Sequence, residues 1–365
     1  MKFRLLGAAF GVAATGAFPA LASAAPTIRV EGASGTLVPE ALVPVAATGT
    51  TTVADTTDSD TITIAANSAT AQVATATGWF GYALGFDLFD FGGPSSFITQ
   101  LGRDKMPTSF TPAWRLKVNH KVTPSGSDTT ILAKGDAALW SFDTEFTTPE
   151  LDVTVPRKSA RVGSPFTVHV TSYDNDGVAT AAAGAKVRFA GETSIADAHG
   201  NVRLTPKTAG ARFVSATAAH AVRSAKRFVC VATSNNTLCS AITAPRSHGA
   251  IAPPAVLLGE TSGTRIEVAI FQQVVAVGAP GIDPPARCRF LSVNRRTLEP
   301  GRNCEKPTWL TATVTDGHWT LRLPTPLPGG HYVAVSRARV KNRVERTQQS
   351  GVNRIALRVA KAGAR

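Results

Sequence analysis

The stretch "AWRLKVNHKVTPSGSDTTILAKGDAALWSF" (residues 113–142) has a tryptophan near each end, Trp114 and Trp140. Its first residues alternate apolar and polar side chains, so Trp114, Leu116 and Val118 fall on one face of a predicted strand. The polar residues that follow are typical of a turn, and a second strand and a Gly-Asp step lead to Trp140. Tryptophans placed in this way pack across a sheet. The alternative is that they line a ligand pocket.

The same alternation recurs along the chain. Short runs such as "TIRVEG", "FTVHVTSY", "RIEVAIF" and "HYVAVSRA" are separated by turn-forming groups such as "DNDG", "DAHG" and "LPGG". This spacing is typical of half-buried strands in packed antiparallel sheets. We therefore predict a mainly β, multi-domain chain, with a small α+β first domain (an antiparallel sheet plus one short helix) followed by two β-sandwich domains. The helix is predicted near residues 69–77, with Ser68 as its N-cap and Gly78 as its stop.

Residues 1–24 have the pattern of an export signal. Lys2 and Arg4 precede an apolar run, and "ASA" at 22–24 resembles a cleavage site. The alternative is a retained anchor helix, but the run is too short and too rich in Gly and Ala for a good membrane span. We expect no transmembrane segment in the mature chain. The predicted location is secreted, extracellular or held non-covalently at the cell surface.

The mature chain of about 340 residues exceeds one ordinary hydrophobic core, so several domains are expected. We place them at residues 25–145, 146–239 and 240–365. Lys and Arg against Asp and Glu number 7 against 12 in the first, 11 against 6 in the second and 18 against 7 in the third. A secreted basic C-terminal part suits anionic cell-envelope polymers or another surface protein as partners, and we expect no nucleic acid. The alternative is a solvated surface that binds nothing.

Four cysteines suit an exported protein and allow three pairings. The local pairs Cys230–Cys239 and Cys288–Cys304 are favoured, because each closes a short loop inside one predicted domain. A zinc site is the alternative, but the chain has no C-x-x-C pair and no nearby histidine cluster to support it.

Residues 27–142 contain further motifs in order: "TIRVEG", an Ala-rich segment, "WRLKVN", a Gly-x-Asp turn at 126–128 and "KGDAALW". In these motifs the segment resembles the transcobalamin-like C-terminal domain of secreted bacterial proteins. The resemblance implies the fold and, from the role of that domain in transcobalamin, cobalamin or another flat molecule as ligand. No other cofactor is expected. The sequence departs from the family pattern at Arg115, where a second aromatic residue is usual, and at His120, where a glycine often follows Val-Asn.

The stretch "GWFGYALGFDLFDFGG" (residues 78–93) is rich in aromatic residues and glycine, as small-molecule pockets are. Its aromatic residues are Trp79, Phe80, Tyr82, Phe86, Phe89 and Phe91. The candidate ligand-binding residues of the first domain are Trp79, Phe80, Tyr82, Phe86, Trp114, Asn119 and Trp140. The alternative is a segment that folds back over the helix and the sheet.

The other two domains have resemblances of their own. "AGAKVRFAG", "ADAHGNVRL" and "TAGARFVSATA" make the second similar to bacterial immunoglobulin-like or carboxypeptidase-regulatory-like sandwiches, which implies a spacer that presents other domains or adheres. Two cysteines, "LPGGHY" and an Arg-Ala strand make the third similar to C-terminal β-sandwich modules of secreted actinobacterial proteins, and no activity follows. "YDNDG" offers Asp174 and Asp176 to calcium, but no further acidic ligand follows it, so we predict a hairpin turn and no metal.

The chain contains no G-x-S-x-G, H-E-x-x-H, P-loop or G-x-G-x-x-G motif, and its seven histidines are scattered. We therefore predict no catalytic residue. The expected function is that of a secreted, non-enzymatic multi-domain protein that binds or displays at the bacterial cell envelope. Two alternatives stay open: a soluble extracellular protein whose first domain holds a corrinoid or other flat molecule, and an envelope polysaccharide hydrolase.

Overall fold

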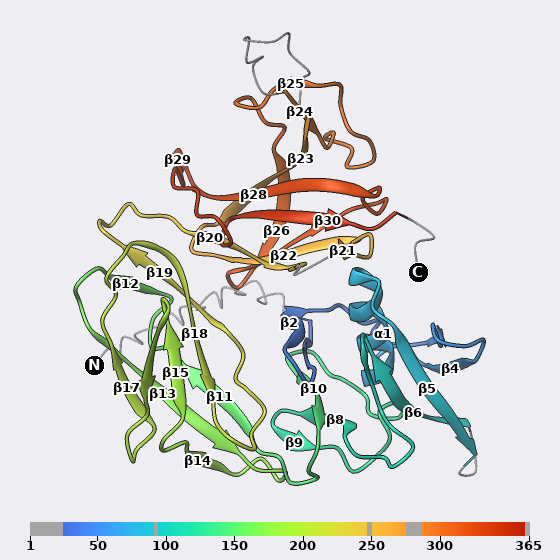
Figure 1. The fold of residues 1–365 in the computed structure, drawn as a ribbon. Coiled ribbons are helices and arrows are strands. Elements are labelled where there is room, and N and C mark those ends of the chain that lie inside the picture. The colour runs from blue at the N-terminus through green and yellow to red at the C-terminus, as the bar shows by residue number, and fades with distance from the viewer. Residues whose placement is uncertain (1–24, 91–93, 247–249, 275–286, 362–365) are drawn as a thin grey trace, which may run out of the picture.

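The computed structural model describes residues 25–90, 94–246, 250–274 and 287–361. They form thirty strands and one helix, which confirms a mainly β, multi-sheet chain. The strands gather into three groups, each with a buried core (Figure 1). We call these groups the first module (25–145), the second module (146–239) and the third module (240–361). The predicted export signal, residues 1–24, lies outside the described residues.

A five-stranded sheet in the order β2-β1-β10-β8-β9 forms the centre of the first module. Its strands are β1 (Thr27–Glu31), β2 (Thr36–Leu42), β8 (Ala113–Val118), β9 (Lys121–Val122) and β10 (Ala137–Asp143). Trp140 on β10 lies opposite Leu116 on β8. β1 and β10 run parallel, so the sheet is mixed and not wholly antiparallel. Parallel neighbours need a long connection, and residues 32–136 supply it. Besides β2, β8 and β9 they form the smaller elements β3 (Thr50–Ala54), β4 (Thr61–Ala65), α1 (Ala69–Phe80), β5 (Leu84–Asp90), β6 (Pro94–Leu101) and β7 (Asp104–Lys105).

Helix α1 begins as predicted and ends later than predicted. Ser68 caps its N-terminus, because its hydroxyl accepts a hydrogen bond from a backbone N–H of the first turn. The helix passes through Gly78 and ends at Gly81, which has a φ of 62° and donates its N–H to the carbonyl of Gly78. The prediction of a stop at Gly78 was therefore wrong. The buried side chain of Trp79 anchors the last turn in the core, and Gly81 provides the left-handed backbone that a helix end favours.

The second module is a β-sandwich of two facing sheets. One sheet contains β11 (Glu150–Thr154), β13 (Phe166–Tyr173), β14 (Ala179–Ala181) and β17 (Asn201–Leu204). The facing sheet has the order β12 (Ser159–Arg161), β19 (Arg227–Ala232), β18 (Gly210–Thr217), β15 (Lys186–Phe189) and β16 (Glu192–Ile195). Buried and more exposed residues alternate along β15 and β17. Val168, Val170, Val187 and Val214 are fully buried between the sheets. This alternation is the one that the sequence pattern predicted.

The third module is one large sheet that folds over its main core. Its main path is β20 (Ser240–Ala244), β22 (Val256–Thr261), β27 (His318–Arg322), β26 (Leu310–Thr315), β23 (Arg265–Val274), β28 (Gly330–Val340), β30 (Arg354–Val359) and β21 (Ala250–Ile251). Three short strands branch from this path, namely β24 (Arg287–Phe290), β25 (Arg302–Asn303) and β29 (Arg343–Val344). Leu257 and Trp319 from one half of the sheet share a core with Ile266 and Val268 from the other half.

Both predicted disulfides are present, with Cα–Cα distances of 5.5 Å for Cys230–Cys239 and 5.0 Å for Cys288–Cys304. Cys288–Cys304 lies within the third module. Cys230–Cys239 lies at the end of the second module, where the Cys239 N–H donates to Ser262 Oγ of the third module at 3.0 Å. This bridge therefore fixes the chain directly before β20, at the junction with the third module.

The first and third modules share an apolar interface. Val256 and Leu258 on β22 belong to the core of the first module. Trp79 at the end of α1 accepts a hydrogen bond from the Ala255 N–H through its carbonyl, at 2.9 Å. The Arg322 guanidinium lies 5.0 Å from the centre of the Trp79 ring. The third module therefore depends on the first to cover part of its sheet.

Polar contacts join the second module to its neighbours. Arg29 on β1 pairs with Glu150 on β11 at 2.7 Å, and Arg227 on β19 bridges Glu40 and Asp152. No helix among the described residues is both long and apolar enough to cross a membrane.

Candidate binding face on the C-terminal sheet

The two tryptophans of the 113–142 segment lie in the core of the first module. Trp140 is 2% exposed and Trp114 is 4% exposed. The Trp114 indole N–H donates to the carbonyl of Asp104 at 2.9 Å, and its ring packs against Phe142 with centroids 5.0 Å apart. Both side chains hold the sheet together, as the packing interpretation predicts.

Asn119 has a structural role beside this sheet. It has a positive φ of 52°, and its side chain donates to Asp136 at 2.8 Å and accepts from the Ala137 N–H at 3.0 Å. These contacts hold the Gly-Asp step of the sequence against the end of β8.

The aromatic residues of the 78–93 segment do not form one group. Trp79, Phe80 and Phe86 are buried, and Trp79 faces the third module. Tyr82 is half-buried beside Phe80, with ring centroids 5.7 Å apart. Phe89 is 37% exposed on β5, and Phe91 lies outside the described residues. The first part of the segment therefore packs into the core, as the alternative prediction of a segment folded back over the helix and the sheet describes.

A groove of about 430 Å³ lies beside α1 in the first module. Small residues of α1, of β3 and of the segments before and after β3 and β4 line most of it, and Tyr82 and Leu84 also line it. Among the predicted ligand-binding residues, Tyr82 is the one that lines this groove. The lining contains no charged side chain.

A row of charged residues lies on the outer face of the third module. Alternation along β23 turns Ile266 and Val268 into the core and leaves Arg265 and Glu267 on the other face. In the antiparallel register Arg339 of β28 lies opposite Arg265, and Arg337 lies opposite Glu267. The sequence pattern of two neighbouring strands therefore places three arginines around one glutamate.

Glu267 holds these arginines in place. Arg337 donates to its Oε2 through Nε at 2.7 Å, and Arg339 donates to its Oε1 at 2.6 Å. Arg265 approaches the same carboxylate at 3.8 Å. Burial alone would raise the pKa of Glu267, but the hydrogen bonds and charges of Arg339 and Arg337 outweigh it and lower the pKa. One carboxylate balances only one of three guanidinium charges, so the cluster is strongly positive.

Trp309, which precedes β26, supports Arg337. The Arg337 guanidinium lies 3.7 Å from the centre of the Trp309 ring, a short cation–π contact. We call Arg265, Arg337, Arg339, Glu267 and Trp309 together the arginine platform.

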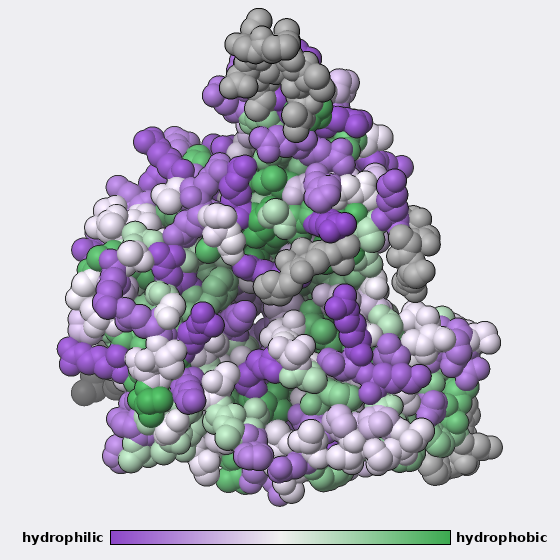
Figure 2. Space-filling view, viewed as in Figure 1, coloured by the Kyte–Doolittle hydropathy of each residue, from purple (hydrophilic) through white to green (hydrophobic). Residues whose placement is uncertain are grey.

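The same face continues along the sheet as an apolar cluster that contains Phe271, Phe290 and Val335. Arg354 lies over the ring of Phe271 and Arg302 over that of Phe290. Figure 2 shows hydrophilic side chains over much of the third module on the visible side, with apolar atoms between them.

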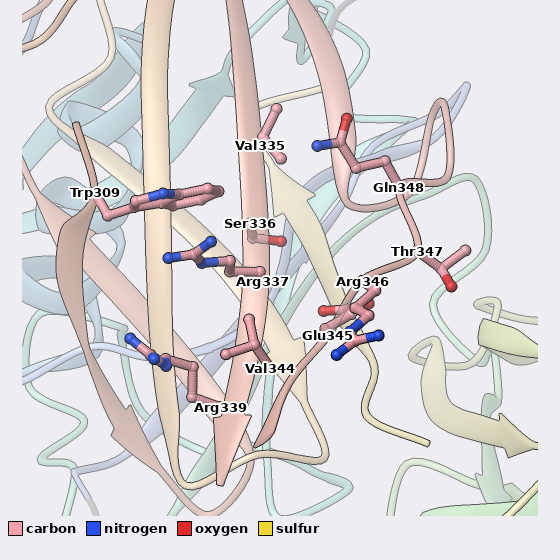
Figure 3. A pocket seen from close by; sticks show the side chains of 10 residues that line it. All are labelled: Trp309, Val335, Ser336, Arg337, Arg339, Val344, Glu345, Arg346, Thr347 and Gln348. Carbon is pink, nitrogen blue, oxygen red and sulfur yellow. The ribbon is translucent and has the colours of Figure 1, made fainter. Parts of the chain in front are cut away.

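A cavity of about 490 Å³ adjoins the arginine platform. Trp309, Arg337 and Arg339 line one side of it, and the chain that follows β29 lines the other with Arg346 and Gln348 (Figure 3). A cavity of this volume is in the range of small-molecule sites, and most of its charged side chains are arginines.

Glu345 also lines this cavity. It accepts hydrogen bonds from the Ser240 N–H and hydroxyl at 3.0 and 2.6 Å, from the Ala338 N–H at 2.9 Å and from Asn353 at 2.9 Å. Burial raises its pKa to about 7, although these hydrogen bonds act in the opposite direction. The protonated form of Glu345 also fits this site. Its carboxyl O–H can donate a hydrogen bond to the Ser240 hydroxyl, which can then donate to Ser336 Oγ at 3.0 Å.

This arrangement is suited to binding. Arginine stays charged at all physiological pH values and forms paired hydrogen bonds to carboxylate and phosphate groups. Within the described residues no group of three or more His, Cys, Asp and Glu side chains could hold a metal ion. At "YDNDG", the Asp174 side chain accepts hydrogen bonds from the N–H groups of Asp176 and Val178, as in the predicted hairpin turn.

The sequence predicted a basic C-terminal segment but did not locate the arginine platform. The signal was present in "RIEVAIF" and "SRARV", two alternating runs whose outward positions are Arg, Glu, Arg and Arg. Locating the site also required the pairing of β23 with β28 and the position of Trp309, which are set by the tertiary fold.

No protein-family model matches the sequence, and no curated protein matches it. The chain is similar to solved structures at low identity. Fibronectin(III)-like modules of Clostridium thermocellum CbhA are 9% identical over 59% of this chain and 96% of that chain, with a TM-score of 0.20. The Escherichia coli adhesin FdeC is 13% identical over 86% of this chain and 87% of that chain, with a TM-score of 0.18.

Escherichia coli alpha-2-macroglobulin is 14% identical over 76% of this chain and 30% of that chain, with a TM-score of 0.21. This chain therefore spans less than a third of that protein. At such TM-scores none of the three structures defines the arrangement or the function of this chain.

Proposed function

We propose that the protein is a secreted, non-catalytic binding protein that attaches to anionic polymers of the bacterial cell envelope through the outer face of its third module. The arginine platform is the observation that carries the proposal, since three guanidinium groups surround one carboxylate beside a polar cavity. Two disulfides fit an extracellular protein. The first 24 residues have the pattern of an export signal.

Net charge supports the same partner. The residues from 240 onward contain 18 Lys and Arg against 7 Asp and Glu. A surface of this kind attracts polyanions over about 10 Å at 0.1 M salt and less at higher salt. Attachment should therefore be reversible and should weaken as salt rises.

Fractionation of the producing cells tests this function. We expect the processed protein outside the cytoplasm, bound to the envelope fraction in low salt and released by about 1 M salt, where charge screening is nearly complete. A cytoplasmic location, or a fully soluble extracellular protein with no affinity for envelopes in low salt, would overturn the proposal.

The groove beside α1 favours a second candidate function. The resemblance of residues 27–142 to the transcobalamin-like domain, together with a groove of about 430 Å³ that Tyr82 lines, supports a flat small molecule as ligand of the first module. Calorimetric titration of the full mature chain with cobalamin tests it. Heat that disappears in Tyr82→Ala would support this function, whereas no heat and no thermal shift would reject it.

A further inference from the structure

Arg337 and Arg339 keep hydrogen-bond donors that no group in the described part of the chain accepts. Arg337 spends Nε and Nη2 on Glu267, and Arg339 spends Nη1. Each guanidinium has five N–H donors, and the remaining donors of both residues have no partner among the described residues. The side chains are 28% and 32% exposed, so these donors can reach a ligand.

The two guanidinium groups are also held rigidly. Glu267, with a side chain only 5% exposed, accepts hydrogen bonds from both guanidinium groups. The Trp309 ring stacks on the guanidinium of Arg337. Two long side chains that are already ordered lose less conformational entropy on binding than mobile ones do. The platform is therefore organised in advance for a group that accepts hydrogen bonds from a guanidinium.

The adjoining cavity supplies further contacts. Arg346, Thr347 and Gln348 line the side of this cavity opposite the platform (Figure 3). Arg346 is exposed and has no partner among the described residues. A guanidinium, a hydroxyl and an amide in one wall suit an acid group that is attached to a hydroxyl-rich unit.

The aromatic rings of this face argue against a single-stranded nucleic acid. Such ligands stack their bases on open aromatic rings. Here a guanidinium lies over each ring, Arg337 over Trp309, Arg354 over Phe271 and Arg302 over Phe290. The rings orient arginines and do not offer a stacking surface.

From these contacts we infer that the arginine platform and its cavity form a discrete oxyanion site, which binds one acidic sugar or polyol unit of the envelope polymer through its carboxylate or phosphate group. The inference rests on the proposed function and goes beyond it, because attachment by diffuse charge alone would need no such site.

Charge-conserving substitutions separate a discrete site from diffuse charge. Lysine keeps the positive charge but forms neither the paired hydrogen bonds nor the stack on Trp309. We would compare Arg337→Lys/Arg339→Lys with the matched control Arg188→Lys/Arg203→Lys, whose arginines are exposed on the second module. Calorimetric titration of each full mature chain would use polygalacturonate for carboxylate and a glycerol phosphate polymer for phosphate.

If the site is discrete, we expect the platform variant to bind the polymer about tenfold more weakly than the parent chain. We expect the control variant to bind it as tightly as the parent chain. The polymer whose binding is weakened more by the platform substitutions carries the acid group that the site recognises. Equal binding by parent, platform variant and control would overturn the discrete site and leave the proposed function standing. Absence of binding by the parent to both polymers would overturn both.

Arg346→Ala provides a second test that does not depend on folding. Because Arg346 has no partner among the described residues, its removal should leave the thermal unfolding temperature unchanged and weaken polymer binding several-fold. Unchanged binding would place Arg346 and the cavity outside the site. A single-stranded oligonucleotide that binds the parent more tightly than either polymer would overturn the ligand class.

Discussion

At Glu267, one buried carboxylate lies within 3.8 Å of three guanidinium groups. Removing its charge leaves Arg337 and Arg339 to repel each other without an anchor. We expect Glu267→Gln to lower the free energy of unfolding by about 2–3 kcal/mol, below the usual cost of breaking a fully buried pair because the arginines are partly exposed. Chemical denaturation beside Glu305→Gln, an exposed control, measures this.

Polymer binding by Glu267→Gln separates positioning of the arginines from attraction by net charge. Glu267→Gln adds one net positive charge to the face, so diffuse attraction would become stronger. If Glu267 positions the arginines, polymer binding should weaken instead. Tighter binding by Glu267→Gln than by the parent would show that charge alone decides attachment.

Glu345 should make stability depend on pH. Its pKa of about 7 in the folded protein lies above the ordinary value of 4.5. The stabilisation from its bound proton is therefore complete below pH 4.5 and is lost as pH rises toward 7, on the order of 1–3 kcal/mol. Denaturant titrations between pH 4.5 and 7.5 should show this loss in the parent and a smaller one in Glu345→Gln; parallel curves would contradict the assignment.

Residue types alone could not show these roles. The sequence predicts that Trp114 and Trp140 pack across strands, and the structure places both in the core. It does not predict which carboxylate balances which arginine, because Glu267 and Arg337 are 70 residues apart in the chain. That pairing depends on strand register, which the alternating pattern alone does not fix between distant strands.

Among the elements, α1 determines how the first module meets the third. Trp79, 6% exposed, lies between the helix and the strand β22. We expect Trp79→Ala to lower the free energy of unfolding by about 3–5 kcal/mol, through lost burial and a cavity. Thermal unfolding of this variant should be compared with Phe110→Ala, whose side chain is 58% exposed. Similar unfolding temperatures in the two variants would contradict this role for Trp79.

The Cys230–Cys239 bridge makes a prediction about the junction of the second and third modules. Because it restricts the unfolded chain, Cys230→Ser/Cys239→Ser should lower stability by about 2–3 kcal/mol. Hydrogen exchange should rise first in β20, which begins one residue after Cys239. Unchanged exchange in β20 would mean that the bridge does not hold the junction.

Strands were the more predictable elements, because period-two alternation directly reflects burial on one face. The end of α1 was less predictable. Both Gly78 and Gly81 suit a helix end, and the choice depends on the burial of Trp79 in a core to which a distant part of the chain contributes.

In the whole molecule the three modules pack against one another and share contacts. Val256 and Leu258 of the third module complete the core of the first, and Arg227 joins the second module to Glu40 of the first. Deleting residues 240–365 would uncover apolar surface around Trp79. Point substitutions in the full chain are therefore the sound way to test the third module.

Co-sedimentation of the full mature chain with purified cell envelopes, in low and in high salt, directly tests whether the third module carries the binding face. Arg337→Ala/Arg339→Ala is compared with Arg188→Ala/Arg203→Ala, which removes the same charge from the second module. We predict that the parent and the control sediment in low salt and that the platform variant stays in solution. Equal sedimentation of the two variants would contradict a binding face on the third module.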